Sequence, residues 1–297
     1  MGIRPGWYIL AYHNISWREG PCVRSLGGTL PPDIFAGHVR AAASRGELVS
    51  VPEGARRLEE GAVDRPLFSF WFDDGLTGVK RYAKPVLDDH GVTAAVSVCS
   101  RLARRSELFW RFQLSWLDSV DALPLLRSRL RSQGLVEGEG VKHFTLDHFS
   151  PVFLDCIDEL WRRFTTSQQR EDAAEMFLEA RDIAELFDSG WTIANHTAGH
   201  YPVSQEHSLP RLCGEFEECQ QWIRDSCGTD SGYWVVPFDW NSSDKAVEAA
   251  DRCRGDRYLV FMGNRGNFPG PRADRRLLFR IGPEGSAADL LRLLRQS

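Results

Sequence analysis

Residues 67–75 read Leu-Phe-Ser-Phe-Trp-Phe-Asp-Asp-Gly, an apolar run that ends in two carboxylates and a glycine. Six consecutive residues of this largely apolar and aromatic character are typical of a β-strand. Asp73 and Asp74 would then lie at the end of that strand. Asp-Asp-Gly is also a common turn sequence, so the alternative is that the two carboxylates only terminate a strand.

Two further strand-like runs end in histidine. The run 191–194 leads into His196 and His200, which lie four residues apart. One helical turn or a tight loop places two such histidines on a common side. The run 8–12 is followed by His13. The alternatives are a half-buried imidazole pair in the first turn of a helix and, for His13, a simple strand end.

Strands and helices alternate along most of the chain. Apolar runs predict strands at 8–12, 67–72, 93–98, 191–194, 233–236, 258–261 and 277–281. Helical spacing predicts helices at 31–43, at 79–91 with a kink at Pro85, at 172–189 and at 286–294. This alternation predicts an α/β fold with a parallel sheet, which fits a closed or partly open barrel. Because the carboxyl ends of barrel strands share one rim, we expect the three motifs to meet there.

The segment 109–171 breaks this alternation. Its apolar residues follow helical spacing, and a Gly/Glu-rich hinge at 134–140 divides it. We therefore expect a single domain over residues 1–297 with a helical insertion at about 109–171. The insertion is expected to act as a lid, a substrate wall or a contact in a homo-oligomer, and an inert extension is the alternative.

Composition and charge limit the classes of function. The chain carries 36 basic and 41 acidic residues, a net charge of −5 without a long basic block, which disfavours nucleic-acid binding. The first residues lack the apolar core of a secretory signal, and no run approaches ~18 apolar residues. We therefore expect no membrane span and a cytoplasmic location. Seven cysteines without a Cys-x-x-Cys pair predict free thiols in a reducing compartment.

The motifs also indicate a chemistry. One carboxylate and two imidazoles can form a three-ligand shell that leaves one position of a metal ion open for water. A second carboxylate beside that shell supplies a base, and a histidine at a third strand end supplies an acid. This combination is typical of metal-assisted hydrolysis.

Three blocks of the sequence carry a family resemblance. Residues 71–75 read Trp-Phe-Asp-Asp-Gly, residues 196–200 read His-Thr-Ala-Gly-His, and residues 235–238 read Val-Val-Pro-Phe. They are similar to the T/S-F-D-D-G, H-[ST]-x-x-H and R-x-P-[YF] blocks of the polysaccharide deacetylases, the NodB homology domain of carbohydrate esterase family 4. The resemblance covers nearly all of the chain outside the helical insertion, and it implies a distorted (β/α)7-8 barrel.

Two departures from the family pattern bear on the mechanism. Val235 stands where the family has an arginine that orients the base, so this chain needs another partner for that base or constrains it less. No histidine follows His207, so the late L-x-H block of the family is absent. The run Ile-Leu-Ala-Tyr-His-Asn at 9–14 resembles that block. Deacetylases of biofilm exopolysaccharides are permuted in this manner, with the catalytic histidine on the first strand.

The resemblance implies a role for each matching residue. The ligands of a divalent metal would be Asp74, His196 and His200, with Zn²⁺ as the first choice and Fe²⁺, Co²⁺ or Ni²⁺ as alternatives.

Three residues would carry the proton transfers and the developing charge. Asp73 would be the general base, and His13 would protonate the departing amine. The backbone N–H of Phe238 would stabilise the oxyanion. If His13 lay away from the site, His143 or His148 would have to supply the acid.

The resemblance also bounds the substrate. We expect hydrolysis of an N-acyl group, most simply N-acetyl, on an amino sugar or a small sugar-containing metabolite. Trp71, Pro237 and Trp240 are candidate substrate-binding residues. Two alternatives stay open: a cyclic amide or imide hydrolase of the allantoinase type, and a non-catalytic sugar-binding barrel.

Overall fold

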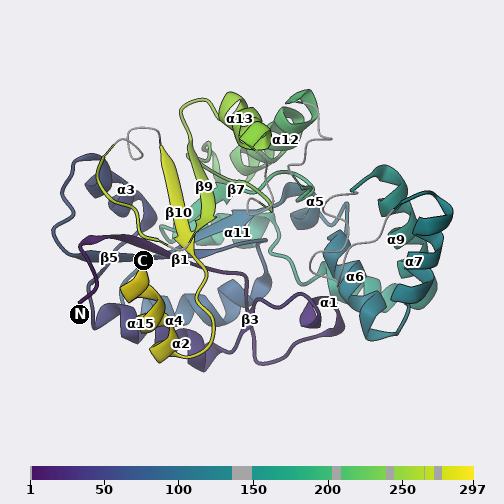
Figure 1. The fold of residues 1–297 in the computed structure, drawn as a ribbon, viewed down its shortest axis with the longest axis horizontal. Coiled ribbons are helices and arrows are strands. Elements are labelled where there is room, and N and C mark those ends of the chain that lie inside the picture. Colours follow the sequence, from purple (N-terminus) through teal and green to yellow (C-terminus); the bar gives the residue numbers. More distant parts are fainter. Residues whose placement is uncertain (1, 136–148, 203–208, 239–243, 264, 271–275) are drawn as a thin grey trace.

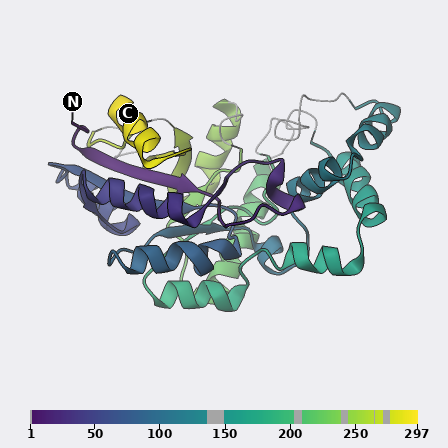
Figure 2. The same ribbon diagram turned by 90° about the horizontal axis from the view of Figure 1, so that it is seen from below.

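The computed structural model describes residues 2–135, 149–202, 209–238, 244–263, 265–270 and 276–297 (Figure 1). A barrel of strands wrapped by helices occupies one part of the molecule, and a group of helices extends from it along the long axis. The view turned by 90° shows the same two parts (Figure 2).

Seven parallel strands close the barrel. They are β1 (Gly6–Tyr12), β5 (Pro66–Phe72), β6 (Ala95–Val98), β7 (Thr192–Asn195), β8 (Tyr233–Val235), β9 (Tyr258–Gly263) and β10 (Leu277–Ile281). Closure occurs at β1, where Leu10 lies opposite Phe70 of β5 on one side and Ile281 of β10 on the other. A short strand, β4 (Glu47–Leu48), also pairs with β5. The predicted α/β barrel of the polysaccharide deacetylase type is therefore confirmed.

The barrel is packed on both sides of its strands, which explains the unbroken apolar runs in the sequence. Trp7 and Trp71 point into the barrel interior, where Trp7 donates a hydrogen bond of 2.9 Å to the hydroxyl of Ser69. The alternate residues Tyr8 and Phe70 point outward into the core beneath the helices. Strands that bury both faces need apolar side chains at nearly every position.

Helices follow most strands and cover the barrel. They are α2 (Pro32–Ala43), α3 (Val51–Glu59), the wide turn η1 (Val79–Ala83) with α4 (Lys84–Asp88), α11 (Ala180–Asp188), α12 (Leu209–Cys227), α13 (Asp244–Cys253) and α15 (Ala287–Gln296). This wide turn, η1, is π-helical and ends two residues before Pro85, where the sequence predicts a kink. The helix α15 begins with the predicted cap, in which the Ser286 hydroxyl accepts from the Asp289 amide.

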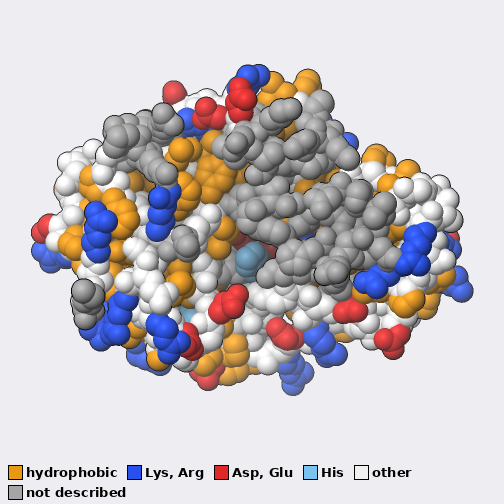
Figure 3. Space-filling view, viewed as in Figure 1, with side chains coloured by type: hydrophobic (Ala, Val, Ile, Leu, Met, Phe, Trp, Pro, Cys, Tyr) orange, Lys and Arg blue, Asp and Glu red, His pale blue; other side chains and the backbone are white. Residues whose placement is uncertain are grey.

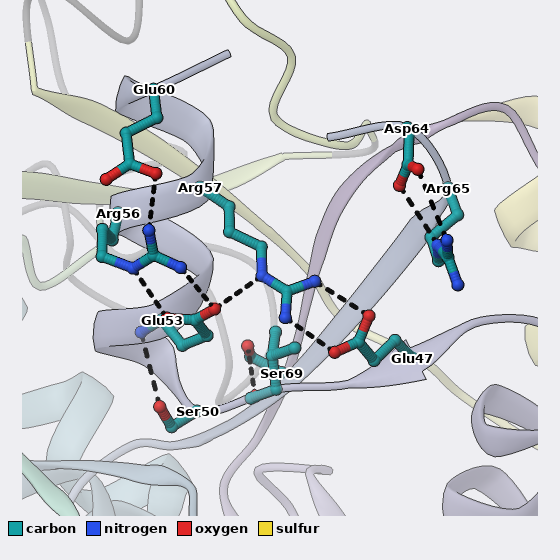
Figure 4. A network of polar contacts seen from close by, with 10 residues as sticks. Glu47, Ser50, Glu53, Arg56, Arg57, Glu60, Asp64, Arg65 and Ser69 are labelled. Atoms are coloured by element: carbon teal, nitrogen blue, oxygen red, sulfur yellow. Dashed lines mark hydrogen bonds and ion pairs between the residues drawn. The ribbon is translucent and has the colours of Figure 1, made fainter. Parts of the chain in front are cut away.

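The helix α3 packs on the interior Trp7 ring. A Cβ at Gly54 would lie 2.2 Å from that ring, so only glycine allows this approach. Arg57 then ties α3 to β4 through two hydrogen bonds of 2.8 Å to Glu47 (Figure 4). Because these charges are partly exposed, the ion pair adds little to the stability of the fold. We attribute to it the positioning of β4.

In the described residues between β6 and β7, the regular elements are helices joined by short loops. After the short α5 (Ser100–Ala103) come α6 (Trp110–Ser119), α7 (Leu123–Ser132), α9 (Pro151–Phe164) and α10 (Ser167–Ala174). The helices α6, α7 and α9 form the extension at one end of the molecule (Figures 1 and 2). Leu117, Phe153 and Trp161 belong to a hydrophobic cluster separate from the barrel core. The helix α1 (Pro21–Arg24) contributes Cys22 and Val23 to this cluster. The short paired strands β2 (Asn14–Ile15) and β3 (Thr29–Leu30) pack through Ile15 and Leu30 on the core beneath the barrel helices.

The prediction of one helix over 172–189 is wrong. The chain leaves the helical conformation after Ala174, and Phe177 forms an isolated β-bridge with Leu76 before α11 begins. The reason is long-range hydrogen bonding. The Leu178 amide donates to the Gly75 carbonyl at 2.7 Å, which ties this segment to the turn after the two carboxylates.

The prediction of free thiols is wrong for two of the seven cysteines. Cys213 of α12 and Cys253 of α13 form a disulfide with a Cα–Cα distance of 5.4 Å. The two residues are 40 positions apart, so their spacing gives no signal in the sequence. The other five cysteines are free thiols.

No helix in the described part of the chain is both long enough and apolar enough to span a membrane.

Candidate active site

A cavity of about 530 Å³ opens at the carboxyl ends of the barrel strands. Its lining includes strand-end residues from β1, β5, β7, β8 and β10, and the first turn of α6. The side chains of chemical interest among them are His13, Asp73, Asp74, Arg111, His196, His200, Phe238 and Arg280. Histidine surface is visible in a hollow near the centre of the face shown in Figure 3. The three sequence motifs therefore meet at one rim of the barrel.

Asp74, His196 and His200 form a compact, buried cluster. The Asp74 Oδ1 atom lies 3.2 Å from His200 Nε2 and 3.6 Å from His196 Nε2, and the two Nε2 atoms are 3.0 Å apart. One ligand atom from each residue falls within 4.8 Å of the others. This spacing is compatible with three ligands directed at one metal ion.

The hydrogen bonds of the cluster test whether a cation fits. His196 Nδ1 is 2.8 Å from the Val235 carbonyl, which can only accept, so Nδ1 carries the proton and Nε2 keeps its lone pair. Asp74 Oδ1 is buried and has no hydrogen-bond donor among the described residues. Lone pairs that converge on one point without a hydrogen-bond donor favour a bound cation. Neutral imidazole and carboxylate are ligands that divalent metals accept.

The protonation states agree with this assignment. Burial, and after it the neighbouring His200, lower the pKa of His196 to about 4, although the carboxylates of Asp73 and Asp74 oppose this effect. Burial raises the pKa of Asp74, but the interactions of this carboxyl with His200 outweigh burial and hold the pKa well below its usual range. At neutral pH the cluster therefore contains an ionised carboxylate and a neutral His196.

Backbone conformation aims these ligands. Asp74, Thr197 and His200 all have positive φ, at 69°, 67° and 55°. Residues with a side chain adopt this left-handed region at a cost, so the surroundings must hold the turns. Glu215 of α12 does so by accepting a 2.8 Å hydrogen bond from the Gly199 amide.

Asp73 lies beside the cluster and is 3% exposed. Its Oδ1 accepts hydrogen bonds from Arg280 Nη1 at 2.6 Å and from the Ser97 hydroxyl at 2.5 Å. Burial raises the pKa of Asp73, but the charge of Arg280, together with two histidines, outweighs it and lowers the pKa to about 2. Both contacts hold Oδ1, which leaves Oδ2 as the oxygen that can accept a proton.

Arg280 supplies the partner that Val235 does not. It lies on β10, is 1% exposed, and stands two strands away from β8, which carries Val235. Sequence reasoning missed this residue. The signal was a single charge inside the apolar strand Leu-Leu-Phe-Arg-Ile at 277–281.

The other predicted catalytic residues reach the same cavity. His13 follows β1, lines the cavity and is exposed. Phe238 also lines it, with φ of 53° and its ring edge-on to His200 at a centroid distance of 4.8 Å. His143 and His148 lie outside the described residues.

The predicted substrate-binding residues have different locations. Trp71 is fully buried inside the barrel, where its indole N–H donates to the Ser97 hydroxyl at 3.3 Å, so it offers no ring face to a ligand. The alternation of side chains along β5 turns the Trp71 ring inward. Pro237 is buried next to Phe238. Trp240 lies outside the described residues.

Comparison with known proteins agrees with this geometry. The family model for polysaccharide deacetylases matches residues 60–253. The chain belongs to the polysaccharide deacetylase family. It is accordingly a hydrolytic deacetylase. A comparison with curated proteins found no match.

Solved structures share the fold over nearly the whole chain. A deacetylase from Streptococcus pyogenes, PplD in complex with acetate, is 16% identical with a TM-score of 0.63, covering 97% of this chain and 98% of its own. IcaB from Ammonifex degensii is 16% identical with a TM-score of 0.61, covering 98% of each chain. A de-N-acetylase from Aggregatibacter actinomycetemcomitans is 16% identical with a TM-score of 0.60, covering 97% of this chain and 99% of its own. At these identities the likeness establishes the fold alone.

Proposed function

We propose that the protein removes an N-acyl group, most simply N-acetyl, from an amino sugar in a metal-dependent hydrolysis. The observation that carries the proposal is the buried cluster of Asp74, His196 and His200 beside an arginine-held Asp73. In a deacetylase family this combination provides a metal site and a base at the same end of the barrel.

Asp74, His196 and His200 would hold the ion, with Zn²⁺ as our first choice. A divalent metal at such a site lowers the pKa of a bound water and polarises the acyl oxygen. The chain itself provides the proton acceptor. Asp73 is ionised at neutral pH and is held through Oδ1, so Oδ2 is available to accept the proton of the attacking water.

The remaining charges are handled by two further residues. His13 lines the cavity and is exposed, so its ring is accessible to the leaving nitrogen. It would donate a proton to that nitrogen, because an amine leaves poorly until it is protonated. The backbone N–H of Phe238 would donate a hydrogen bond to the developing oxyanion.

The substrate is an N-acetylated hexosamine unit, free or within a short oligomer. A cavity of about 530 Å³ is in the range for a small ligand and would accommodate such a unit. Three subsidiary predictions are that Zn²⁺ is the resident ion, that the chain is cytoplasmic, and that the segment 109–171 contacts a second copy. None of the three is required for the proposed reaction.

Metal content is the first test. Purified protein should contain one divalent ion per chain by elemental analysis, and Asp74→Ala and His196→Ala should each lose it. Ser297→Ala is the control, because Ser297 directly follows α15 as its C-cap residue and is not part of the cavity lining. Wild-type metal content in Asp74→Ala would contradict the ligand assignment.

The base assignment has its own test. Asp73→Asn should keep the metal but lower kcat for acetate release from N-acetylglucosamine oligomers by ~10²–10⁴-fold, because the amide cannot accept the proton. Near-wild-type activity in this variant would remove Asp73 from the mechanism. Ring opening of cyclic imides without acetate release from any N-acetyl sugar would favour the alternative hydrolase.

A further inference from the structure

Arg111 is a cationic side chain in the cavity that the proposed mechanism does not use. It is the second residue of α6 and lines the same cavity as the metal cluster. Its guanidinium carbon lies 5.3 Å from the centre of the Phe238 ring, which in turn contacts the His200 ring. The helical segment between β6 and β7 therefore places a positive charge beside the reacting centre.

Two nitrogens of this guanidinium are buried without a hydrogen-bond partner in the described part of the chain. Its Nε and Nη2 atoms are inaccessible to solvent and have no hydrogen-bond partner among the described residues. Burial lowers the pKa of Arg111, and only the charge of Asp74 opposes this effect. Buried polar groups in proteins are almost always paired, so an unpaired guanidinium in a ligand cavity indicates that a ligand supplies the partner.

The acidic groups of the cavity do not provide that partner. Asp73 is engaged by Arg280, and Asp74 belongs to the metal cluster. Glu284 is exposed on the loop after β10 and forms no ion pair with Arg111. Helix α6 adds to the positive potential, since it starts at Trp110 without a side-chain cap on its free amides.

We propose that Arg111 binds an anionic substituent, a carboxylate or a phosphate, on the sugar whose N-acyl group is removed. A planar guanidinium matches either group through two parallel hydrogen bonds, whereas a neutral hydroxyl would leave its charge uncompensated. The inference rests on the proposed function, because the anion would be recognised in the same cavity and next to the scissile amide.

The test compares neutral and anionic substrates with the metal-loaded enzyme. The neutral substrate is N-acetylchitobiose, and the anionic ones are N-acetylglucosamine 6-phosphate and a disaccharide of N-acetylglucosamine with glucuronic acid. Arg111→Gln should lower kcat/KM for at least one anionic substrate by about 10–100-fold and leave the neutral one within about threefold. The two anionic substrates distinguish phosphate from carboxylate. The kcat/KM of Arg111→Lys for the anionic substrate should lie between those of the wild-type protein and Arg111→Gln, since lysine keeps the charge but loses the planar fork.

Three controls make the result interpretable. Arg105→Gln removes one positive charge from a surface ion pair outside the cavity and should leave kcat/KM unchanged for the neutral and the anionic substrates. Arg111→Met should not lower Tm, because it replaces an unpaired buried charge, whereas a structural role predicts a clear loss. Equal losses on neutral and anionic substrates would overturn the inference, and so would the absence of any loss.

A direct binding measurement separates this inference from the proposed function. Calorimetric titration of the wild-type protein and Arg111→Gln with the same three sugars needs no turnover. Tighter binding of an anionic sugar, lost in Arg111→Gln, would support the inference even if no acetate were released. Equal binding of neutral and anionic sugars would overturn it while leaving the deacetylase activity standing.

Discussion

At the scale of single residues, Arg280 determines how the base is held. It approaches Asp73 at 2.6 Å and makes the largest contribution to lowering the pKa of that carboxyl. The family pattern has an arginine where this chain has Val235. In the structure, an arginine from a different strand, Arg280 of β10, contacts the base instead. The link was not predictable from the sequence, because it depends on which strands meet when the barrel closes.

Replacing Arg280 should therefore change the pH dependence as well as the rate. Arg280→Met removes the largest of the effects that oppose burial, so the pKa of Asp73 rises. A base works only when deprotonated, so the acidic limb of kcat/KM should move to higher pH, with kcat reduced by ~10–10³-fold. Arg280→Lys should restore part of both effects. The pH–rate profile is the deciding measurement, with Arg276→Met, just before the same strand, as the control.

An unchanged acidic limb in Arg280→Met, at normal metal content, would show that Arg280 does not set the charge state of the base. A uniform loss of activity at every pH would then point to a structural role.

At the scale of elements, α12 supports the loop that carries two of the proposed ligands. Glu215 on this helix accepts the Gly199 amide at 2.8 Å and also pairs with Arg101 at 2.8 Å. The loop between Thr197 and His200 adopts left-handed conformations, so it needs this external support.

Glu215→Ala should weaken metal binding by about 10–100-fold, the usual cost of removing a group that orients ligands. Glu215→Gln keeps an acceptor for the Gly199 amide and should retain most of the affinity. Competition with a chelating dye measures the dissociation constant. Glu217→Ala, at an exposed position of the same helix, is the control. Equal metal affinity in Glu215→Ala and wild-type protein would contradict a positioning role.

The elements themselves were predictable where burial dictates the pattern. Strand β5 could be read from its apolar run because both of its faces are covered. The break after Ala174 could not, because Met176 and Phe177 fit helical spacing, and the β-bridge to Leu76 and the hydrogen bonds to residues 75–77 come from a segment distant in the sequence. The Arg111 side chain was likewise hidden within a segment that predicted only a helix.

At the scale of the whole molecule, a buried histidine joins distant segments. His38 on α2 is 0% exposed, with Nε2 3.1 Å from the Gly285 carbonyl and Nδ1 3.3 Å from the Tyr12 hydroxyl. The carbonyl only accepts, so Nε2–H donates to it and Nδ1 accepts from tyrosine. Neutral imidazole satisfies both contacts, and burial accordingly lowers the pKa of His38, although the backbone contacts oppose this effect.

This arrangement predicts an acid-sensitive contribution to stability. The unfolded chain binds a proton at His38 more readily than the folded one, so the contribution is complete above the ordinary histidine pKa. It is lost as the pH falls from there toward the lowered folded pKa, by at most about 1.4 kcal/mol per pH unit. The free energy of unfolding, measured with urea at pH 7.5 and pH 5, should differ less between the two pH values for His38→Gln than for wild-type protein. An identical difference in both proteins would rule out His38 as the titrating group.

Closure of the barrel at β1 also sets the order in which the site can mature. The strand β1 can pair with β5 early in synthesis, but its other edge stays open until β10 arrives. Arg280 arrives with that same last strand. A nascent chain that extends only through β9 therefore contains all of the proposed ligands, the base and the acid, but of the two side chains that hold Asp73 it has Ser97 and lacks Arg280. Completion of the fold and arrival of the charge that lowers the pKa of the base are thus one event, and a chain that has not finished folding has not yet given its proton acceptor that charge.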